Sequence, residues 1–192
     1  MQITESLFVA YFQCPFKAFL KSKGEVGEVV DYEVIQKEAD SRFRDVAIER
    51  LLRSHTESQV TREPSSLRLA VKEGVKLIVG ATVEAQGMTL RFDVLERLVD
   101  PDDDRRSVYV PLQFSHRHKL TREDSLLAAF HGIVLAEALG HPVPFVKVVH
   151  GSDFSVSKIK LVAPTGAPRL VKEARKILDR LRKQIESTSP PL

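Results

Sequence analysis

Residues Val75–Val99 have the sequence VKLIVGATVEAQGMTLRFDVLERLV, and this stretch decides how the chain is expected to fold. Its first part is rich in β-branched and small residues, and its last part alternates between apolar and polar residues. The pair Gln86-Gly87 between the two parts favours a tight turn. The pattern predicts a β-hairpin in which Asp93 lies within the second strand.

A third strand and a helix are expected next along the chain. The charged segment Asp100–Ser107 has the composition of a turn, and Val108–Ser115 has that of a strand. Thr121 and Asp124 resemble a capping box that begins a helix, and Gly140 is placed to end it. Two further strands are predicted at Phe145–His150 and Ser157–Val162.

Helices are predicted on both sides of this strand region. Thr4 can cap a first helix, which Pro15 interrupts because proline has no amide hydrogen. Residues 55–66 have the composition of a loop, and a short helix over Leu69–Glu73 should end at Gly74. The last helix is predicted over Ala167–Glu186. The longest is predicted over Tyr32–Ser54, with an apolar stripe of Ile35, Ala39, Phe43, Val46, Leu51 and Leu52.

The order of these elements predicts an α/β fold with a mixed central sheet flanked by helices. A three-stranded meander is followed by a helix and a further strand, which differs from a doubly wound parallel sheet. The length of 192 residues fits one domain, 1–192, with 187–192 as a flexible end and a potential boundary to further domains of a longer protein.

The overall composition excludes several classes of protein. The single cysteine, Cys14, excludes an intramolecular disulfide and favours a reducing compartment, and we expect its thiol to be buried. No apolar run approaches the ~18 residues of a membrane span, and the N-terminus lacks the features of a signal peptide. We therefore expect a cytoplasmic protein without a membrane partner. The net charge of +3 is compatible with nucleic acid but does not require it.

Four segments together resemble one known family. They are ITESLFVAYFQCPFKAFL at 3–20, EGVKLIVGATVEAQGMTLRFDVLERL at 73–98, YVPLQFSHRHKLTREDSLLAAFHGIVLAEALG at 109–140 and PFVKVVHG at 144–151. They resemble RecB-type nucleases of the PD-(D/E)XK superfamily, particularly those close to the CRISPR-associated exonucleases. The resemblance implies a restriction-endonuclease-like core.

The resemblance also implies a degenerate catalytic centre. In that family a hairpin Asp and a carboxylate on the next strand hold a divalent metal ion, and a lysine two residues later lies near the attacking water. Hard ions such as Mg²⁺ prefer oxygen ligands of this kind. Asp93 matches the first position, whereas the second carboxylate falls on Gln113 and the lysine on Ser115. A histidine of the family's long helix falls on Arg42, so the remnant positions are Arg42, Asp93, Gln113 and Ser115, and a metal at Asp93 would be held weakly.

These positions also have interpretations that involve no metal. Asp93 is either a remnant ligand or a half-exposed acid paired with Arg91 or Arg97. Gln113 and Ser115 either bind a phosphate or contact solvent at the end of a strand.

A rearranged centre made of Asp93, Glu96, His116 and Lys119 is a further alternative. Glu96 is three residues from Asp93 on a strand, however, so we expect the two side chains on opposite faces. His116 and His118 are otherwise part of a solvated turn. The Gln and Tyr of the family's later helix fall on Leu127 and His131.

Cofactors other than a metal ion are not expected in this chain. Cys14-Pro15 resembles the first ligand of the iron–sulfur cluster in relatives, whose other three cysteines lie near the C-terminus. Such a cluster usually needs four thiolates, and this chain has one. A cluster is therefore expected only if cysteines follow Leu192 in a longer protein, and Mg²⁺ or Mn²⁺ only if the centre is active.

The last predicted helix carries basic side chains largely away from its apolar stripe. They either follow a phosphate backbone or form ordinary soluble surface. These residues are Lys172, Arg175, Lys176, Arg180 and Lys183.

The expected function follows from Gln113-Phe114-Ser115 standing in place of an acid-x-Lys triplet. We expect a non-catalytic nuclease-fold module that binds nucleic acid or is a structural part of a larger nucleic-acid-processing protein. The alternatives are an active metal-dependent DNA nuclease with a rearranged site and a protein-interaction scaffold.

Overall fold

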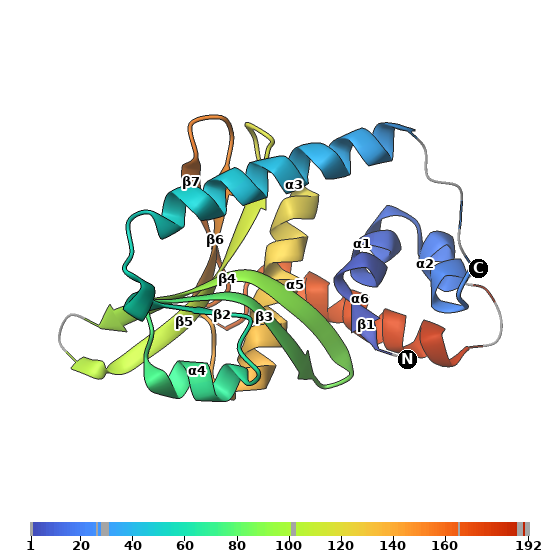
Figure 1. Cartoon of the computed structure of the whole chain (residues 1–192). Helices are drawn as coiled ribbons and strands as arrows, with labels where there is room; N and C mark the ends of the chain where they lie inside the picture. The colour runs from blue at the N-terminus through green and yellow to red at the C-terminus, as the bar shows by residue number, and fades with distance from the viewer. Residues whose placement is uncertain are drawn as a thin grey trace.

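The chain folds as a mixed α/β structure, in which helices cover both faces of a seven-stranded sheet (Figure 1). The computed structural model describes residues 2–25, 27, 31–100, 103–164, 166–187 and 190. The strands are β1 (Ile3–Thr4), β2 (Val60–Arg62), β3 (Leu77–Ala85), β4 (Met88–Asp100), β5 (Asp103–Ser115), β6 (Phe145–His150) and β7 (Ser155–Lys160). The helices are α1 (Glu5–Gln13), α2 (Pro15–Ser22), α3 (Asp31–Leu52), α4 (Leu67–Glu73), α5 (Arg122–Leu139) and α6 (Arg169–Glu186), with a 3₁₀ turn at Glu57–Gln59.

The predicted three-stranded meander and mixed sheet are confirmed. Gln86 and Gly87 connect β3 to β4 with φ angles of 49° and 73°, the left-handed conformations that a two-residue turn of this kind requires. β5 pairs antiparallel to β4, and after α5 the strand β6 pairs in parallel with β5. The turn predicted over Asp100–Ser107 is wrong in extent, because β4 continues to Asp100 and β5 already begins at Asp103.

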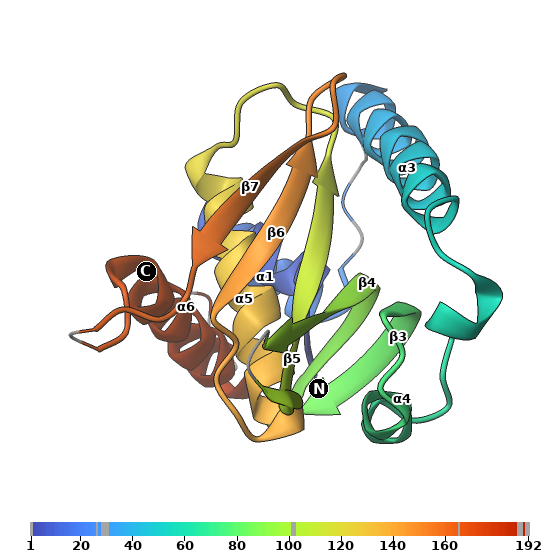
Figure 2. The same cartoon turned by 90° about the vertical axis from the view of Figure 1, so that its left-hand side faces the viewer.

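α5 is the central helix, and its predicted ends are confirmed. The Thr121 hydroxyl accepts a hydrogen bond from the Asp124 amide, and the Asp124 carboxylate accepts one from the Thr121 amide. These bonds satisfy amides that the first turn of a helix leaves without partners. Gly140 ends the helix in the left-handed conformation. The helix lies against one face of the sheet (Figure 2).

The segment 55–66, predicted as a loop, contains a 3₁₀ turn and the strand β2. β2 pairs in parallel with β3, with Val60 opposite Leu77, and forms an edge of the sheet. A three-residue strand whose partner is distant in sequence leaves almost no periodic signal. At the other edge, β7 begins at Ser155, two residues earlier than predicted.

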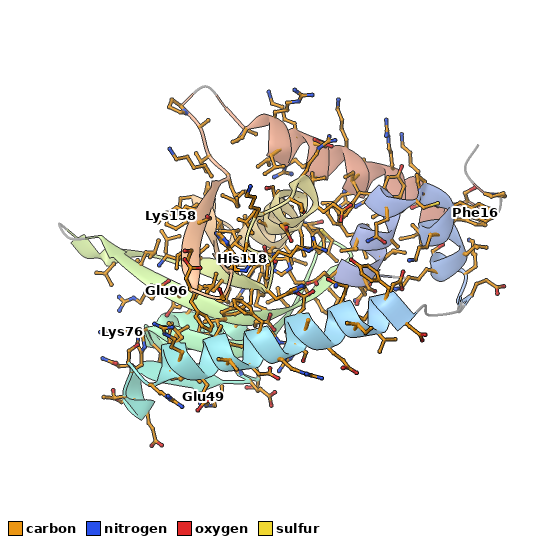
Figure 3. The ribbon with its side chains drawn as sticks, turned by 90° about the horizontal axis from the view of Figure 1, so that it is seen from above. Phe16, Glu49, Lys76, Glu96, His118 and Lys158 are labelled. Atoms are coloured by element: carbon orange, nitrogen blue, oxygen red, sulfur yellow. The ribbon has the colours of Figure 1, made fainter. Side chains whose placement is uncertain are left out.

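The long helix α3 is confirmed, but its predicted apolar stripe is only partly confirmed. Ala39, Phe43, Leu51 and Leu52 are partly buried, whereas the other two members of the stripe are exposed. Ile35 is 62% exposed and Val46 is 53% exposed, and Ala47 is the buried residue of this helix. The C-terminal half packs on the sheet, whereas the N-terminal half runs on beyond it (Figure 1). Glu49 lies on the solvent side of the helix (Figure 3). The helix therefore buries little apolar surface for its length.

Two clusters of buried side chains occupy the two faces of the sheet. The larger cluster lies among the sheet, α1, α5 and α6, and it extends along the chain from Ile3 to Leu181. The smaller one consists of Leu77, Val94 and Leu112, covered by residues of α3. No helix in the described ranges is long and apolar enough to cross a membrane. Of the predicted flexible end, residues 188, 189, 191 and 192 lie outside the described residues.

Candidate functional site

Asp93 lies at a twist in the central hairpin. Its position in β4 faces Gly80 of β3, between the pairs Val79–Val94 and Ala81–Phe92. Gly80 has a φ of 73°, and a Cβ there would approach the Arg91 guanidinium to 2.9 Å. The regular alternation of faces shifts at this point, because Phe92 belongs to the larger core and Val94 to the smaller one. A strand distorted in this way can direct a polar side chain out of the core.

The ion partner of Asp93 is an arginine of α3. Arg44 Nε lies 3.9 Å from Asp93 Oδ1, with the side chains 40% and 29% exposed. The partners expected from the sequence are engaged elsewhere, since Arg91 bonds to Glu63 and Arg97 donates to the carbonyl of Gly74. Asp93 is therefore paired across the fold rather than along its own strand.

A second acid and a histidine lie close to this pair. Glu5, the first residue of α1, forms a hydrogen bond of 2.8 Å with the buried Nε2 of His131 on α5. The ring of His131 also meets Phe92 edge-on. Elements far apart in sequence thus place two carboxylates, a guanidinium and an imidazole close enough for their charges to act on one another. Together with Gln113 of β5, we call these residues the Asp93 centre: Glu5, Arg44, Asp93, Gln113 and His131.

The two carboxyl groups of the Asp93 centre are shifted in opposite directions. Burial raises the pKa of Asp93 above its ordinary value of 3.8; Arg44 opposes that rise, and the charge of Glu5 adds to it. Burial would also raise the pKa of Glu5, but the hydrogen bond and charge of His131, together with Arg44, lower it below 4.5 overall. Ionised Asp93 is therefore held at a cost, whereas ionised Glu5 is stabilised.

Gln113 and Ser115 are buried, so the interpretation that they contact solvent is wrong. Their exposed fractions are 8% and 7%. The pairing of β4 with β5 ends at Val94 and Leu112, so Asp93 and Gln113 are the next residues of the two strands beyond that pair. The amide nitrogen of Gln113 has no hydrogen-bond partner within the described residues, whereas the Ser115 hydroxyl accepts a bond from the amide of Arg117. A buried unpaired amide is costly, which makes Gln113 notable.

The structure does not bring Arg42 to the Asp93 centre. Its side chain is 80% exposed and pairs with Glu38 on the same helix. The face of α3 that meets the sheet carries Asp40 and Arg44 instead, four residues apart. Asp40 Oδ1 lies 2.6 Å from His116 Nδ1 and also accepts a bond from the His116 amide.

The rearranged centre considered from the sequence is not assembled. Glu96 (Figure 3) pairs with Lys147 of β6, His116 pairs with Asp40, and Lys119 is exposed. Among the described residues, no three His, Cys, Asp or Glu side chains lie so that they could hold a metal ion together.

The residues at the metal position that the resemblance implies do not fit a divalent ion. Mg²⁺ and Mn²⁺ need oxygen ligands with enough negative charge to offset their own. Here Asp93 supplies one carboxylate at the expected position, Gln113 is neutral, and the Arg44 guanidinium already lies beside Asp93. No step of a metal-assisted hydrolysis follows from this geometry.

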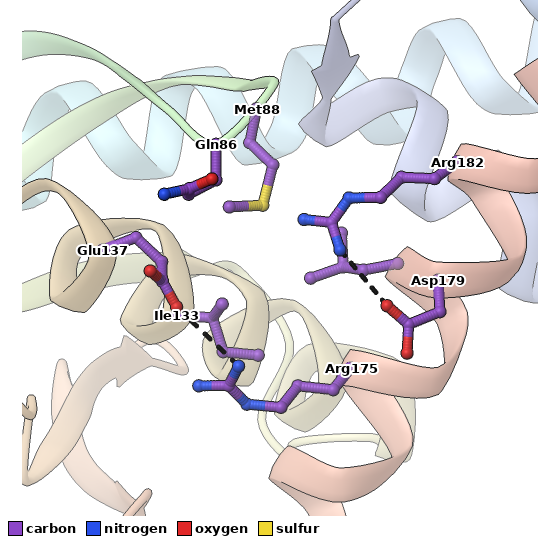
Figure 4. Close-up of a pocket in the computed structure, with 8 residues that line it drawn as sticks. Gln86, Met88, Ile133, Glu137, Arg175, Asp179 and Arg182 are labelled. Carbon is purple, nitrogen blue, oxygen red and sulfur yellow. Dashed lines mark hydrogen bonds and ion pairs between the residues drawn. The ribbon is translucent and has the colours of Figure 1, made fainter.

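The five basic residues predicted on the last helix are exposed on α6, while its other side is buried. Arg175 differs from the rest because it pairs with Glu137 of α5 at 3.7 Å. It lines a hollow of about 320 Å³ with Asp179, Arg182 and Met88 (Figure 4). The remaining four form no ion pair with a described residue, and we call them the α6 stripe: Lys172, Lys176, Arg180 and Lys183.

Cys14 is exposed, contrary to the expectation that its thiol is buried. The residue connects α1 to α2 in an extended conformation and therefore belongs to the buried face of neither helix. The carbonyl of its neighbour Pro15 accepts a hydrogen bond of 2.7 Å from Gln184 near the end of α6. An iron–sulfur cluster completed by cysteines beyond Leu192 stays a prediction.

Sequence reasoning missed Glu5, Asp40 and Arg44. Asp40 and Arg44 share a helical face with the buried Ala47, so the correct rotation of α3 would have identified them. Nothing in the local sequence marks Glu5, which reaches His131 across 126 positions of the chain.

Comparisons with known proteins do not assign a family. No family model and no curated protein matches the chain. A solved structure titled "Crystal structure of SSO0001" is similar with a TM-score of 0.33 and 12% sequence identity, covering 93% of this chain and 87% of that one. A similarity this weak supports no inference about function.

Proposed function

We propose that this chain is a non-catalytic domain of nuclease-like fold that binds nucleic acid through α6. The observation that carries the proposal is the α6 stripe, Lys172, Lys176, Arg180 and Lys183, whose charges are exposed and not neutralised by a described acid. They recur every three or four residues, so they lie along one side of the helix over about 16 Å. A row of this kind suits contact with successive phosphates.

The buried side of α6 supports this proposal by fixing the orientation of the stripe. Val171, Ala174, Leu178 and Leu181 pack into the larger core, so the helix cannot rotate without exposing them. The charges are therefore presented on a rigid element, which lowers the entropic cost of binding an extended charged ligand.

The Asp93 centre supports the absence of catalysis. Hydrolysis by a metal-dependent nuclease needs an ion that polarises the phosphate and activates water. The centre offers a neutral amide at Gln113 and a serine at Ser115 where the family has an acid and a lysine, and it places Arg44 beside its aspartate.

Fluorescence anisotropy with labelled single- and double-stranded DNA and RNA tests the proposal. Binding should weaken as salt rises and should persist when EDTA replaces Mg²⁺. Lys176→Glu and Arg180→Glu should each weaken binding several-fold. Arg53→Glu is the matched control, because Arg53 is exposed just after the end of α3 and the substitution changes the net charge equally.

The same samples separate the alternatives. Absence of salt-dependent binding would favour a protein-interaction scaffold and refute the proposal. Cleavage of any of these substrates in Mg²⁺ or Mn²⁺ that disappears in Asp93→Ala would show an active nuclease instead.

A further inference from the structure

Arg44 is placed to act on both carboxylates of the Asp93 centre. Its Nε lies 3.9 Å from Asp93, and its positive charge lowers the pKa of Asp93 and of Glu5. Arg44 also donates to Ser41 on the preceding turn of α3 and lies 3.6 Å from Asp45. These contacts hold the guanidinium at the edge of the centre.

The charges around Asp93 explain why a cation is needed there. Asp93 and Glu5 bring two negative charges to a partly buried site, and Gln113 adds none. His131 bonds to Glu5, whereas Arg44 is the ion partner of Asp93. Like charges in such a site repel unless a positive group offsets them. A guanidinium stays protonated at any pH that a protein tolerates, so Arg44 supplies this charge permanently.

We propose that Arg44 is the resident cation of the Asp93 centre, where it takes the place that a divalent ion would need and makes the domain independent of Mg²⁺ and Mn²⁺. The proposal deepens the non-catalytic function proposed above and rests on it only in treating this centre as inactive. A divalent ion approaching Asp93 would be repelled by Arg44 and would find a single charged ligand at the family position.

The proposal predicts that the centre becomes a cation site once the guanidinium is removed. Arg44→Met keeps most of the apolar side chain but leaves the Asp93 and Glu5 carboxylates without that positive charge. Mg²⁺ and ions like it bind proteins through one or two carboxylates and complete their coordination with water. The variant therefore keeps the Asp93 carboxylate as an ion ligand but lacks the positive charge that lies beside it in the natural chain.

Titration of Mn²⁺ followed by electron paramagnetic resonance of the free ion is the direct test. Arg44→Met should bind one equivalent at least about tenfold more tightly than the natural chain. Arg42→Met is the matched control, because Arg42 lies two residues away on the same helix but is exposed and paired with Glu38. The double variant Arg44→Met/Asp93→Asn should lose the new site.

Two results would overturn the proposal: binding of Mn²⁺ by the natural chain as tight as by Arg44→Met, or no gain in a folded Arg44→Met. Arg44→Lys is a second variant in which the positive charge is kept. It should stay folded and should bind Mn²⁺ no more tightly than the natural chain. Tighter binding of Mn²⁺ by Arg44→Lys would mean that Arg44 does not act through its charge. DNA binding measured on the same samples separates the proposals. If the samples bind DNA but Arg44→Met does not bind Mn²⁺ more tightly, only the proposed role of Arg44 is refuted. If Arg44→Met binds Mn²⁺ more tightly but the samples do not bind DNA, only the proposed role of α6 is refuted.

Discussion

The two helices that cover opposite faces of the sheet are held in different ways. α5 has 18 residues, and nine of them are buried. α3 has 22 residues, and Ala47 is the buried one. α5 is fixed by the hydrophobic effect, which is strong but not directional. α3 depends more on a few directional contacts. The helix that supplies Arg44 to the Asp93 centre is therefore the one that contributes least to the buried core.

The contacts that hold α3 are spaced along its inner side. Asp40 bonds to His116, and Arg44 pairs with Asp93. Phe43 stacks on Phe154 of the β6–β7 turn, and Arg50 covers the same ring. Because two of these contacts involve the neighbourhood of the candidate site, the position of α3 and the chemistry of the Asp93 centre are coupled.

Truncating an aromatic residue on each helix should give the largest contrast. Phe130 of α5 is fully buried and stacks on Phe8, so Phe130→Ala should cost about 3–5 kcal/mol of unfolding free energy. Tyr32→Ala on α3 removes a side chain that is 70% exposed and should cost about 0.5 kcal/mol or less. Urea denaturation measures both. Equal losses would contradict the different roles of the two helices.

Breaking a polar contact of α3 should have an intermediate effect. Asp40→Ala removes the acceptor of two hydrogen bonds from His116 and should cost about 1 kcal/mol. Hydrogen exchange should accelerate along α3 and remain unchanged in α5, because only α3 is held by this contact. Glu38→Ala is the control on the exposed side of the helix. Faster exchange spread evenly over the molecule would argue against a separately held helix.

The smallest effects are expected from neutralising the two acids of the Asp93 centre, and they should have opposite signs. Glu5 has a lowered pKa, so its ionised form stabilises the fold above pH 4.5 and that contribution is lost as pH falls through the folded-state pKa. Glu5→Gln should therefore lower the melting temperature slightly at pH 7. Asp93 has a raised pKa, so its ionisation opposes folding at neutral pH.

Asp93→Asn should accordingly raise the melting temperature slightly at pH 7. Its advantage should vanish as pH falls below 3.8, where the acid is protonated in both the folded and unfolded chain. Thermal melts of the two variants and the natural chain from pH 3 to pH 7 measure both signs. A loss of stability in Asp93→Asn at pH 7 would mean that the attraction of Arg44 outweighs the burial of the aspartate.

Local sequence patterns were sufficient for most elements of the fold. Gln86-Gly87 predicts the hairpin because few residue pairs adopt two left-handed conformations in succession. Thr121, Asp124 and Gly140 predict the ends of α5 because they satisfy groups that every helix leaves unpaired. The short edge strand β2 could not be predicted this way, since its stability comes from a partner distant in the sequence.

The sequence by itself determined the strand order of the meander and the central helix, and it led us to single out Asp93, Gln113 and Ser115. The tertiary structure decided what surrounds Asp93, because Glu5, Arg44 and His131 come from three different helices. The rotation of α3 selects Arg44 rather than Arg42, and it is set by a small core and a few polar contacts. The periodicity of apolar residues predicts which side of a helix is buried. Because α3 buries few side chains, its periodicity predicts its rotation poorly, and contacts made only in the folded chain set that rotation.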